Sequence, residues 1–244
     1  MSERAGDFSI SRWRAWAPGV ADRPDWRDWI TGKRRDAGEQ PDVSFLPALL
    51  RRRLDRVGRM ALHVAWRCAE GHAAVPMVFA SRHGSIARTV QLLDDLARNE
   101  PLSPAIFSLS VHNSIAGLFS MARSDRSAAT ALAAGHRTLV FALLEGIGML
   151  VEGADKVLVV YADETLPPEY GAYLRQSETA FAVGLLLTTP DGNQPMYRLA
   201  QAHNTASGPR PEVALMDFLL QDAPVAGLVG GDPGWQLLRL GGHA

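Results

Sequence analysis

Cysteine, net charge and long hydrophobic runs are all scarce in this sequence. The single cysteine, Cys68, has no partner for an internal disulfide and cannot build a multi-cysteine zinc site. The 23 arginines and 2 lysines nearly balance 26 acidic residues, so the net charge is -1. We therefore expect no general attraction to nucleic acid or to an anionic membrane.

Hydrophobic runs stay short throughout the sequence. The longest, near 157–162 and 181–187, have the length of strands and fall far short of the ~20 residues that cross a bilayer. The first ten residues lack the basic-then-apolar signature of a secretory signal. A cytoplasmic protein without a membrane segment is expected. No phosphate-binding glycine loop, HExxH motif or paired-carboxylate signature is present, so neither a cofactor nor a metal is expected.

The composition is that of a folded domain, because 47% of the residues are hydrophobic and 21% are charged. Apolar periodicity predicts strands that alternate with helices, an α/β layered fold with a mostly parallel sheet. Between the first strand and the first helix, 17–43 is expected to be an irregular segment packed by Trp26 and Trp29. The expected strands are 7–16, 75–80, 128–133, 155–162, 178–189 and 196–202. The expected helices are 46–68, 85–98, 110–122, 137–151 and 212–221. An extended piece that begins at 103 is expected before the helix 110–122.

The stretch 127–164 is the most informative part of the chain. It predicts a strand, a sharp turn at Ala134-Gly135-His136, a helix and a second strand. The helix 137–151 is almost entirely apolar, which indicates burial on all sides, inside the molecule or at a subunit interface. Glu145 lies within it and needs a hydrogen-bonding partner if it is buried.

This stretch resembles the segment of β-ketoacyl synthases that carries the nucleophilic cysteine at the turn between strand and helix. Other pieces resemble the same family in the same order: FSISRWRAWAPG, VFASRHGSIARTVQLL, LSPAIFSLSVHNSIAGLFSMA and FAVGLLLTTPDGNQPMYRLAQAHNTAS. The resemblance covers about 7–206. It implies a thiolase-like α/β layered fold, about half of a ketosynthase. The whole of 1–244 is then one domain, with a core at about 7–206 and a C-terminal tail at about 207–244.

Two departures from the family shape the functional expectation. The turn carries Gly135 and His136 where the family has its cysteine, and the chain stops where the family's second half, with its two histidines, would begin. His203 matches neither of those histidines. The chain therefore resembles short, half-length ketosynthase-like proteins found beside aryl polyene genes, which themselves resemble chain-length factors. Gly135, His136 and His203 are therefore not expected to act as catalytic groups.

The resemblance implies a partner and a role. A complete β-ketoacyl synthase would pair with the chain as a heterodimer, through the strand near 128–133. The chain would support condensation by that partner and shape the end of its acyl tunnel, so that a polyketide or polyene chain grows on an acyl carrier protein.

Several further residues are candidates for the tunnel or the interface. His112 and Asn113 stand at the family's Pro-Asn position and are expected to cap the following helix or to pin an interface loop. Phe119 and Phe141 are candidates for the blind end of the tunnel, because a bulky side chain there would stop elongation. Phe119 is favoured, since Phe141 is expected to lie in the core.

Two surface features have both a plain and a functional interpretation. Arg52, Arg56 and Arg59 follow 4-3 spacing and should share one side of a helix. They form either a solvated face or a docking patch for an acidic acyl carrier protein. The segment 82–84, Arg-His-Gly, is expected to anchor a loop, and Cys68 to be a small buried side chain.

Alternatives to the paired subunit remain open. An independent acyltransferase or hydrolase could use His136, or one of Ser108, Ser110 and Ser114 near His112, although no Gly-x-Ser-x-Gly motif is present. A homodimeric scaffold is a third possibility.

Overall fold

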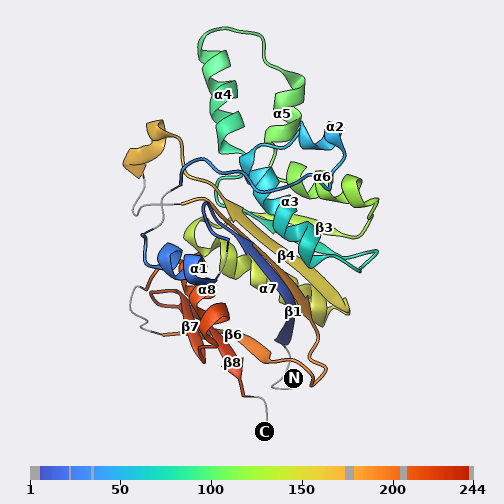
Figure 1. The fold of residues 1–244 in the computed structure, drawn as a ribbon, viewed down its shortest axis with the longest axis vertical. Helices are drawn as coiled ribbons and strands as arrows, with labels where there is room; N and C mark the ends of the chain where they lie inside the picture. The colour runs from blue at the N-terminus through green and yellow to red at the C-terminus, as the bar shows by residue number, and fades with distance from the viewer. Residues whose placement is uncertain (1–5, 22, 34–35, 174–178, 204–207, 242–244) are drawn as a thin grey trace.

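A single sheet of eight strands organises the protein (Figure 1). The computed structural model describes residues 6–21, 23–33, 36–173, 179–203 and 208–241. The strand order is β3-β2-β4-β5-β1-β6-β8-β7. The strands are β1 (Asp7–Trp16), β2 (Met77–Ala80), β3 (Ala129–Leu132), β4 (Lys156–Asp163), β5 (Phe181–Thr188), β6 (Met196–Ala202), β7 (Val225–Val229) and β8 (Gly234–Leu240).

The sheet is mixed, and the expectation of a mostly parallel sheet is wrong. Only β2 runs parallel to its neighbours, β3 and β4. All other neighbouring strands are antiparallel. The reason lies in the connections: β1 enters between β5 and β6 in the opposite direction to both, and a short turn reverses the chain between β7 and β8.

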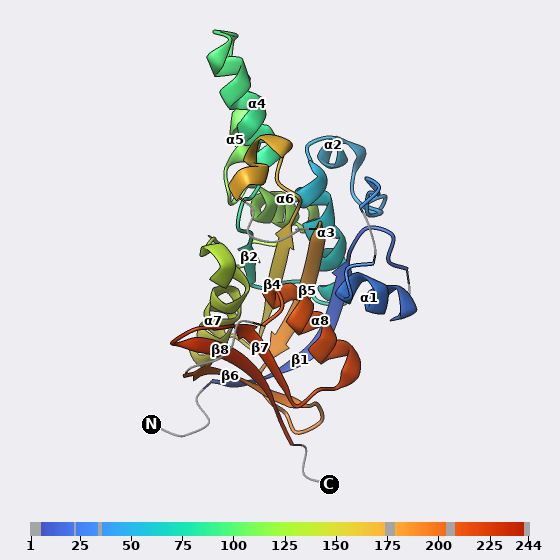
Figure 2. The same cartoon turned by 90° about the vertical axis from the view of Figure 1, so that its left-hand side faces the viewer.

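Helices cover both faces of the sheet, and its β6-β8-β7 end turns across the rest (Figure 2). α3 and α6 pack on one face, and α7 packs on the other, where α8 and α1 also lie. The helices are α1 (Arg23–Ile30), α2 (Ala48–Arg51), α3 (Arg56–Cys68), α4 (Ile86–Ala97), α5 (Pro104–Ser110), α6 (Ser114–Arg123), α7 (Thr138–Val151) and α8 (Pro211–Gln221), with short 3-10 turns η1 (Gly135–Arg137) and η2 (Pro168–Tyr173).

Three expected segments differ from the structure. The helix expected over 46–68 is broken into α2 and α3, because the Asp55 carboxylate caps α3 by accepting from the Gly58 N–H at 2.9 Å. The piece after Ser103 is helical, not extended, since the Ser103 hydroxyl caps α5 and Pro104 suits its first turn. The segment 17–43 contains α1, whose two tryptophans are buried as expected, with the Trp29 ring stacked on Phe181 at 5.0 Å.

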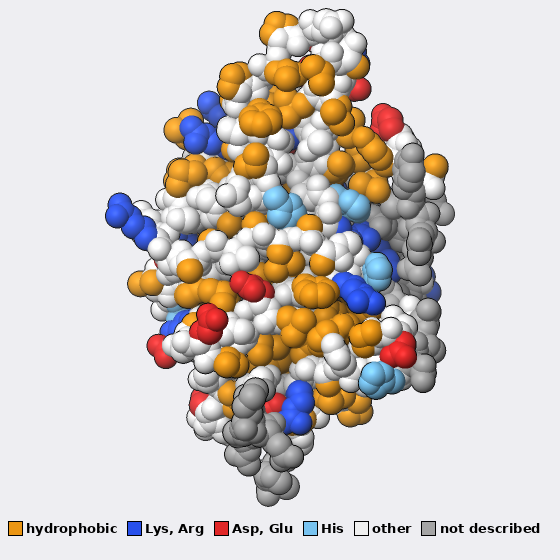
Figure 3. All heavy atoms as spheres, turned by 180° about the vertical axis from the view of Figure 1, so that it is seen from behind, with side chains coloured by type: hydrophobic (Ala, Val, Ile, Leu, Met, Phe, Trp, Pro, Cys, Tyr) orange, Lys and Arg blue, Asp and Glu red, His pale blue; other side chains and the backbone are white. Residues whose placement is uncertain are grey.

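One face of α7 stays uncovered in this chain, so the chain by itself does not bury the helix on all sides as expected. Phe141 is 41% exposed, and Glu145 and Val151 are exposed with it. The opposite face packs so closely that a Cβ added at Gly146 would lie 2.6 Å from the Val159 Cγ2 atom. Figure 3 views the side of the molecule on which α7 lies and shows hydrophobic side chains at the surface there.

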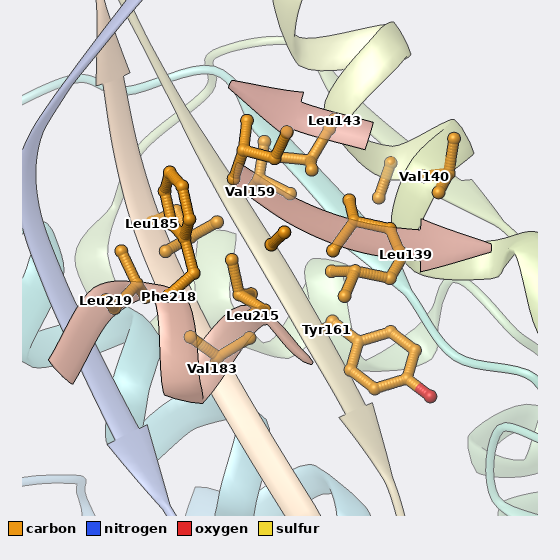
Figure 4. Packing of buried hydrophobic residues seen from close by; sticks show 14 of the residues in the cluster. Leu139, Val140, Leu143, Val159, Tyr161, Val183, Leu185, Leu215, Phe218 and Leu219 are labelled. Atoms are coloured by element: carbon orange, nitrogen blue, oxygen red, sulfur yellow. The ribbon is translucent and has the colours of Figure 1, made fainter. Parts of the chain in front are cut away.

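The core lies on both sides of the sheet. Alternate residues of β4 point to the two clusters: Leu158 and Val160 toward α3 and α6, Val159 and Tyr161 toward α7 and α8 (Figure 4). Within the segment 207–244, which was expected to be a tail, residues of 213–237 belong to this core. α8 buries Leu215, Met216 and Phe218, and β8 pairs with β6 over its whole length.

Candidate functional site

The turn between β3 and α7 is the place where the sequence resemblance predicts the position of a nucleophile. Gly135 begins η1 with φ +55°, a conformation that L side chains rarely adopt. Thr138, the first residue of α7, holds the turn: its hydroxyl donates to the Gly135 carbonyl at 2.6 Å and accepts from the Ala134 N–H at 2.9 Å. The geometry of a strand-to-helix elbow is therefore present, and Thr138 is a supporting residue that the sequence analysis missed.

No side chain at this elbow can act as an activated nucleophile. Gly135 has none, and the His136 ring is exposed, with no hydrogen bond to any residue that the structure describes. Without a hydrogen-bonded partner, nothing fixes the tautomer or the orientation of this imidazole.

The cysteine lies elsewhere and is inert, in agreement with its expected structural role. Cys68 is the last residue of α3, fully buried, with its Sγ 3.2 Å from the Gly184 carbonyl oxygen. Burial raises the pKa of its thiol to about 12. The reactive thiolate is therefore absent at neutral pH.

His112 pins the α5–α6 junction to the edge strand. Its Nε2 donates to the Leu132 carbonyl at 2.9 Å, and its ring packs against Phe79. Gly84, with φ +57°, leaves room for this ring, because a Cβ there would lie 2.9 Å from the His112 Nδ1 atom. Asn113 occupies the position before α6 but its side chain makes no capping hydrogen bond, so the capping alternative is wrong. Pinning is the contact observed.

Asp163, at the end of β4, organises the loop that follows β2. Its carboxylate accepts from the Ser81 hydroxyl at 2.7 Å, the Arg82 N–H at 2.9 Å and the Arg82 Nε at 3.1 Å. The Ser81 hydroxyl in turn accepts from the Gly84 N–H at 2.8 Å. This confirms the predicted loop anchor at 82–84. The acid that secures it was missed, although an Asp directly after an apolar strand is the signal that could have indicated it.

Two further carboxyl groups lie near this end of the sheet, that of Glu164 partly buried and that of Glu212 buried. Burial raises the pKa of Glu164 to about 7, with the neighbouring Asp55 as a second cause, and its Oε1 has no partner among the described residues. Burial also raises the pKa of Glu212, against the effect of the Arg210 guanidinium at 3.3 Å.

The structure reverses the expected positions of the two phenylalanines. Phe119 is 2% exposed in the core beneath α6, with the Arg123 guanidinium over its ring. Phe141 is exposed on the open face of α7, not in the core as expected. On the same helix Glu145 accepts from the Thr130 hydroxyl of β3 at 3.3 Å, so the open face adjoins the edge strand.

The three arginines of the expected docking patch do not share a helix side. Arg52 follows the end of α2, whereas Arg56 and Arg59 lie in α3. The Arg56 guanidinium is largely buried and paired with Asp36 at 2.6 Å, and Arg59 donates to the Arg51 carbonyl. The prediction that they share one side was wrong because the helix expected over 46–68 is interrupted before Asp55.

A serine–histidine arrangement is not formed around His112. The hydroxyls of Ser108, Ser110 and Ser114 each donate to a carbonyl of α5 instead. Among the described residues, no group of three or more His, Cys, Asp or Glu side chains could hold a metal ion.

No single helix in the described ranges is long and apolar enough to cross a membrane. α5 and α6 pass that test only as a pair, and they are bent by 94°.

Comparison with known sequences decides the family. The family described as β-ketoacyl synthase, N-terminal domain, matches residues 26–223. The chain belongs to this family. No curated protein matches it.

Solved structures of ketosynthases share its fold. A chain of the ketosynthase (ApeO) in complex with its chain length factor (ApeC) from Xenorhabdus doucetiae gives a TM-score of 0.82 at 25% identity, covering 95% of this chain and 99% of that chain. The ishigamide ketosynthase/chain length factor gives 0.62 at 16% identity, covering 82% and 68%. A β-ketoacyl synthase from Burkholderia phymatum gives 0.55 at 12%, covering 90% and 70%. The expected thiolase-like fold, about half of a ketosynthase, is confirmed.

Proposed function

We propose that the chain is a non-catalytic, chain-length-factor-type subunit that pairs with a complete β-ketoacyl synthase. The observation that carries the proposal is the elbow at Gly135 and His136. The backbone of this elbow is formed, and a hydrogen bond from Thr138 stabilises it, yet its side chains include no nucleophile. A condensing enzyme needs a thiolate at this helix N-terminus, so condensation requires another subunit.

The likeness to the ApeO–ApeC complex supports a synthase as partner. Both chains are covered almost end to end in that comparison, so the matched chain is about as long as this one. The proposed product class is a polyketide or aryl polyene chain carried by an acyl carrier protein.

The proposed seam is the outer edge of β3. The carbonyls of Ala128 and Leu132 accept hydrogen bonds from β2, so the alternate residues Ala129 and Ala131 direct their N–H and C=O groups outward. β3 is the last strand on its side of the sheet. Pairing with a strand of the synthase would satisfy these groups and cover the edge.

The decisive experiment compares the chain alone with the chain co-expressed with complete β-ketoacyl synthases from the same genome. Each preparation is incubated with malonyl and acyl carrier proteins, and products are read by mass spectrometry. We expect elongation only from a complex. Robust elongation by the chain alone would overturn the proposal.

A tunnel role now favours Phe141, because it is exposed beside the proposed seam whereas Phe119 is core. In the active complex, Phe141→Ala should lengthen the products while the complex stays intact, since removing a bulky side chain admits further methylenes. Phe119→Ala should instead destabilise the chain by about 3–5 kcal/mol. An unchanged product distribution in Phe141→Ala would exclude a gate at this position.

Fewer arginines of the patch are available for docking a carrier protein than the sequence predicted. Arg52 is exposed, while Arg56 and Arg59 are engaged within the chain. Arg52 is therefore the member that is available to an acidic carrier protein.

A further inference from the structure

α4 and α5, with the connection at 98–103, form a projecting pair of helices that we call the arm. It extends beyond the sheet in two perpendicular views (Figures 1 and 2). No residue of 86–110 is buried, although the two helices contact each other. α5 has only 7 residues, and helices shorter than ~12–15 residues are marginal on their own. The arm therefore lacks the cover that such helices normally need.

The arm exposes large apolar side chains. Phe107 is 61% exposed and Leu96 is 59% exposed, and Leu93 and Leu102 are exposed with them. Hydrophobic side chains gather on this projecting end in Figure 3, on the same side of the molecule as the open face of α7. Large apolar side chains exposed together on one projecting element are typical of an interaction site.

Hydrogen bonds and an ion pair fix the base of the arm to the rest of the fold, so the arm has a defined position. The Arg88 side chain, largely buried, donates to the carbonyls of Leu109 and Arg53, and its Nε lies 3.3 Å from the Asp55 carboxylate. One guanidinium thus ties α4 to α5, to the end of α2 and to the cap of α3. A partner would meet a preformed surface and lose less entropy on binding.

The arm is continuous with the edge of the sheet. α5 leads through His112 into α6, which packs against β3, and the His112 ring donates to the last residue of that strand, Leu132. A protein that pairs with β3 would therefore meet the arm as part of the same surface.

The edge strand alone is too small for a stable interface. β3 has 4 residues, whereas stable interfaces bury about 800 Å² and 20–30 residues on each side. We infer that the arm is the second half of the contact, and that it lies in an apolar groove of the complete β-ketoacyl synthase. This inference rests on the proposed function.

The charges of the arm select a synthase over a second copy of this chain. Its tip carries Asp94, Asp95 and Glu100, and among the described residues of the tip the one cation is Arg98, which pairs with Asp94 at 3.8 Å. Two copies joined through their arms would bring these acids together, which costs free energy. The synthase groove is therefore expected to have an apolar floor and a basic rim.

The test uses the full chain co-expressed with tagged complete β-ketoacyl synthases from the same genome. The variant Leu96→Glu/Phe107→Glu places charge on the apolar surface of the arm. The control Gln91→Glu adds a charge at an exposed polar position of α4. Both altered side chains of the double variant are exposed, so the fold should survive, and the melting temperature of each variant is measured.

We expect the double variant to weaken the complex about 100-fold, tenfold for each anchor, and the control to bind as wild type does. Hydrogen exchange in 86–110 should slow at least tenfold when the wild-type complex forms. If the double variant binds the synthase as tightly as wild type does, or if hydrogen exchange in 86–110 does not change, the inferred contact of the arm is wrong. The proposed role as a subunit would then still stand. Failure of the wild-type chain to bind any synthase would overturn the proposed function itself. Loss of self-association by the double variant, with synthase binding retained, would assign the arm to a second copy and overturn the inference.

Discussion

Glu164 shows how one buried carboxyl group can make stability depend on pH. Its Oε1 is enclosed, with no hydrogen-bond partner among the described residues. Burial is the largest cause of its raised pKa, and the charge of Asp55 adds to it, against the opposing effect of Arg56. Its pKa is raised from 4.5 to about 7, so the folded chain holds this proton more tightly than the unfolded chain does. The contribution is therefore fully present below about pH 4.5 and is lost as the pH rises to about 7.

Glu164→Gln removes this titration while keeping the shape of the side chain. At pH 8 the variant should be more stable than wild type by up to about 3 kcal/mol, and the difference should shrink toward pH 5. Urea unfolding at several pH values measures it. Glu169→Gln, at an exposed position of η2, is the control and should follow wild type. Parallel pH profiles for wild type and Glu164→Gln would refute the assignment.

The site residues divide by whether their role depends on local sequence or on tertiary contacts. The empty elbow at Gly135 was predictable, because its strand, turn and helix are adjacent in the sequence. The bond from His112 to Leu132 and the network around Asp163 join residues far apart in the sequence, so no local pattern indicated their partners. Phe141 was misplaced because an apolar helix gives no sign of which side lacks cover.

Among the elements, those with strong periodicity were predicted well. β1, β2, α4, β3, β4, β6 and α8 lie close to the expected ranges. The break between α2 and α3 was missed because apolar spacing continued through 52–55, where the capping by Asp55 overrides it. β7 and β8 were missed because 225–240 is rich in glycine and its partner, β6, is specified only by tertiary pairing.

At the element scale, α7 approaches the sheet as closely as its glycines allow. Gly146→Ala would place a Cβ 2.6 Å from the Val159 Cγ2 atom and 3.1 Å from the Leu187 Cδ1 atom. We expect a loss of about 1–3 kcal/mol in the free energy of unfolding, through overpacking. Gly148→Ala on the same helix meets nothing within 4 Å and should gain about 0.5–1 kcal/mol through helix propensity. Chemical denaturation of both variants measures the difference. Equal effects would mean that α7 lies farther from the sheet.

For the whole molecule, the C-terminal segment completes the core of a chain with half the length of a ketosynthase. Leu215, Met216, Phe218, Leu228 and Leu237 are each at most 1% exposed. A fully buried side chain of this kind contributes about 1.5–3 kcal/mol. Together these five match the whole free energy of unfolding of an ordinary domain, about 5–15 kcal/mol. We therefore predict that the segment is required for folding.

Removal of 208–244 tests this requirement. It would uncover the β4 and β5 side chains that α8 covers, among them Tyr161 and Val183, together with part of α7 (Figure 4). We expect the shortened chain to lose its near-UV circular dichroism and its cooperative thermal transition, and to bind a hydrophobic dye. Removal of 241–244 alone, beyond the end of β8, should leave the melting temperature unchanged. A cooperative transition in the chain that lacks 208–244 would show that the core is complete by residue 206 and that α8 and β8 are not required for it to fold.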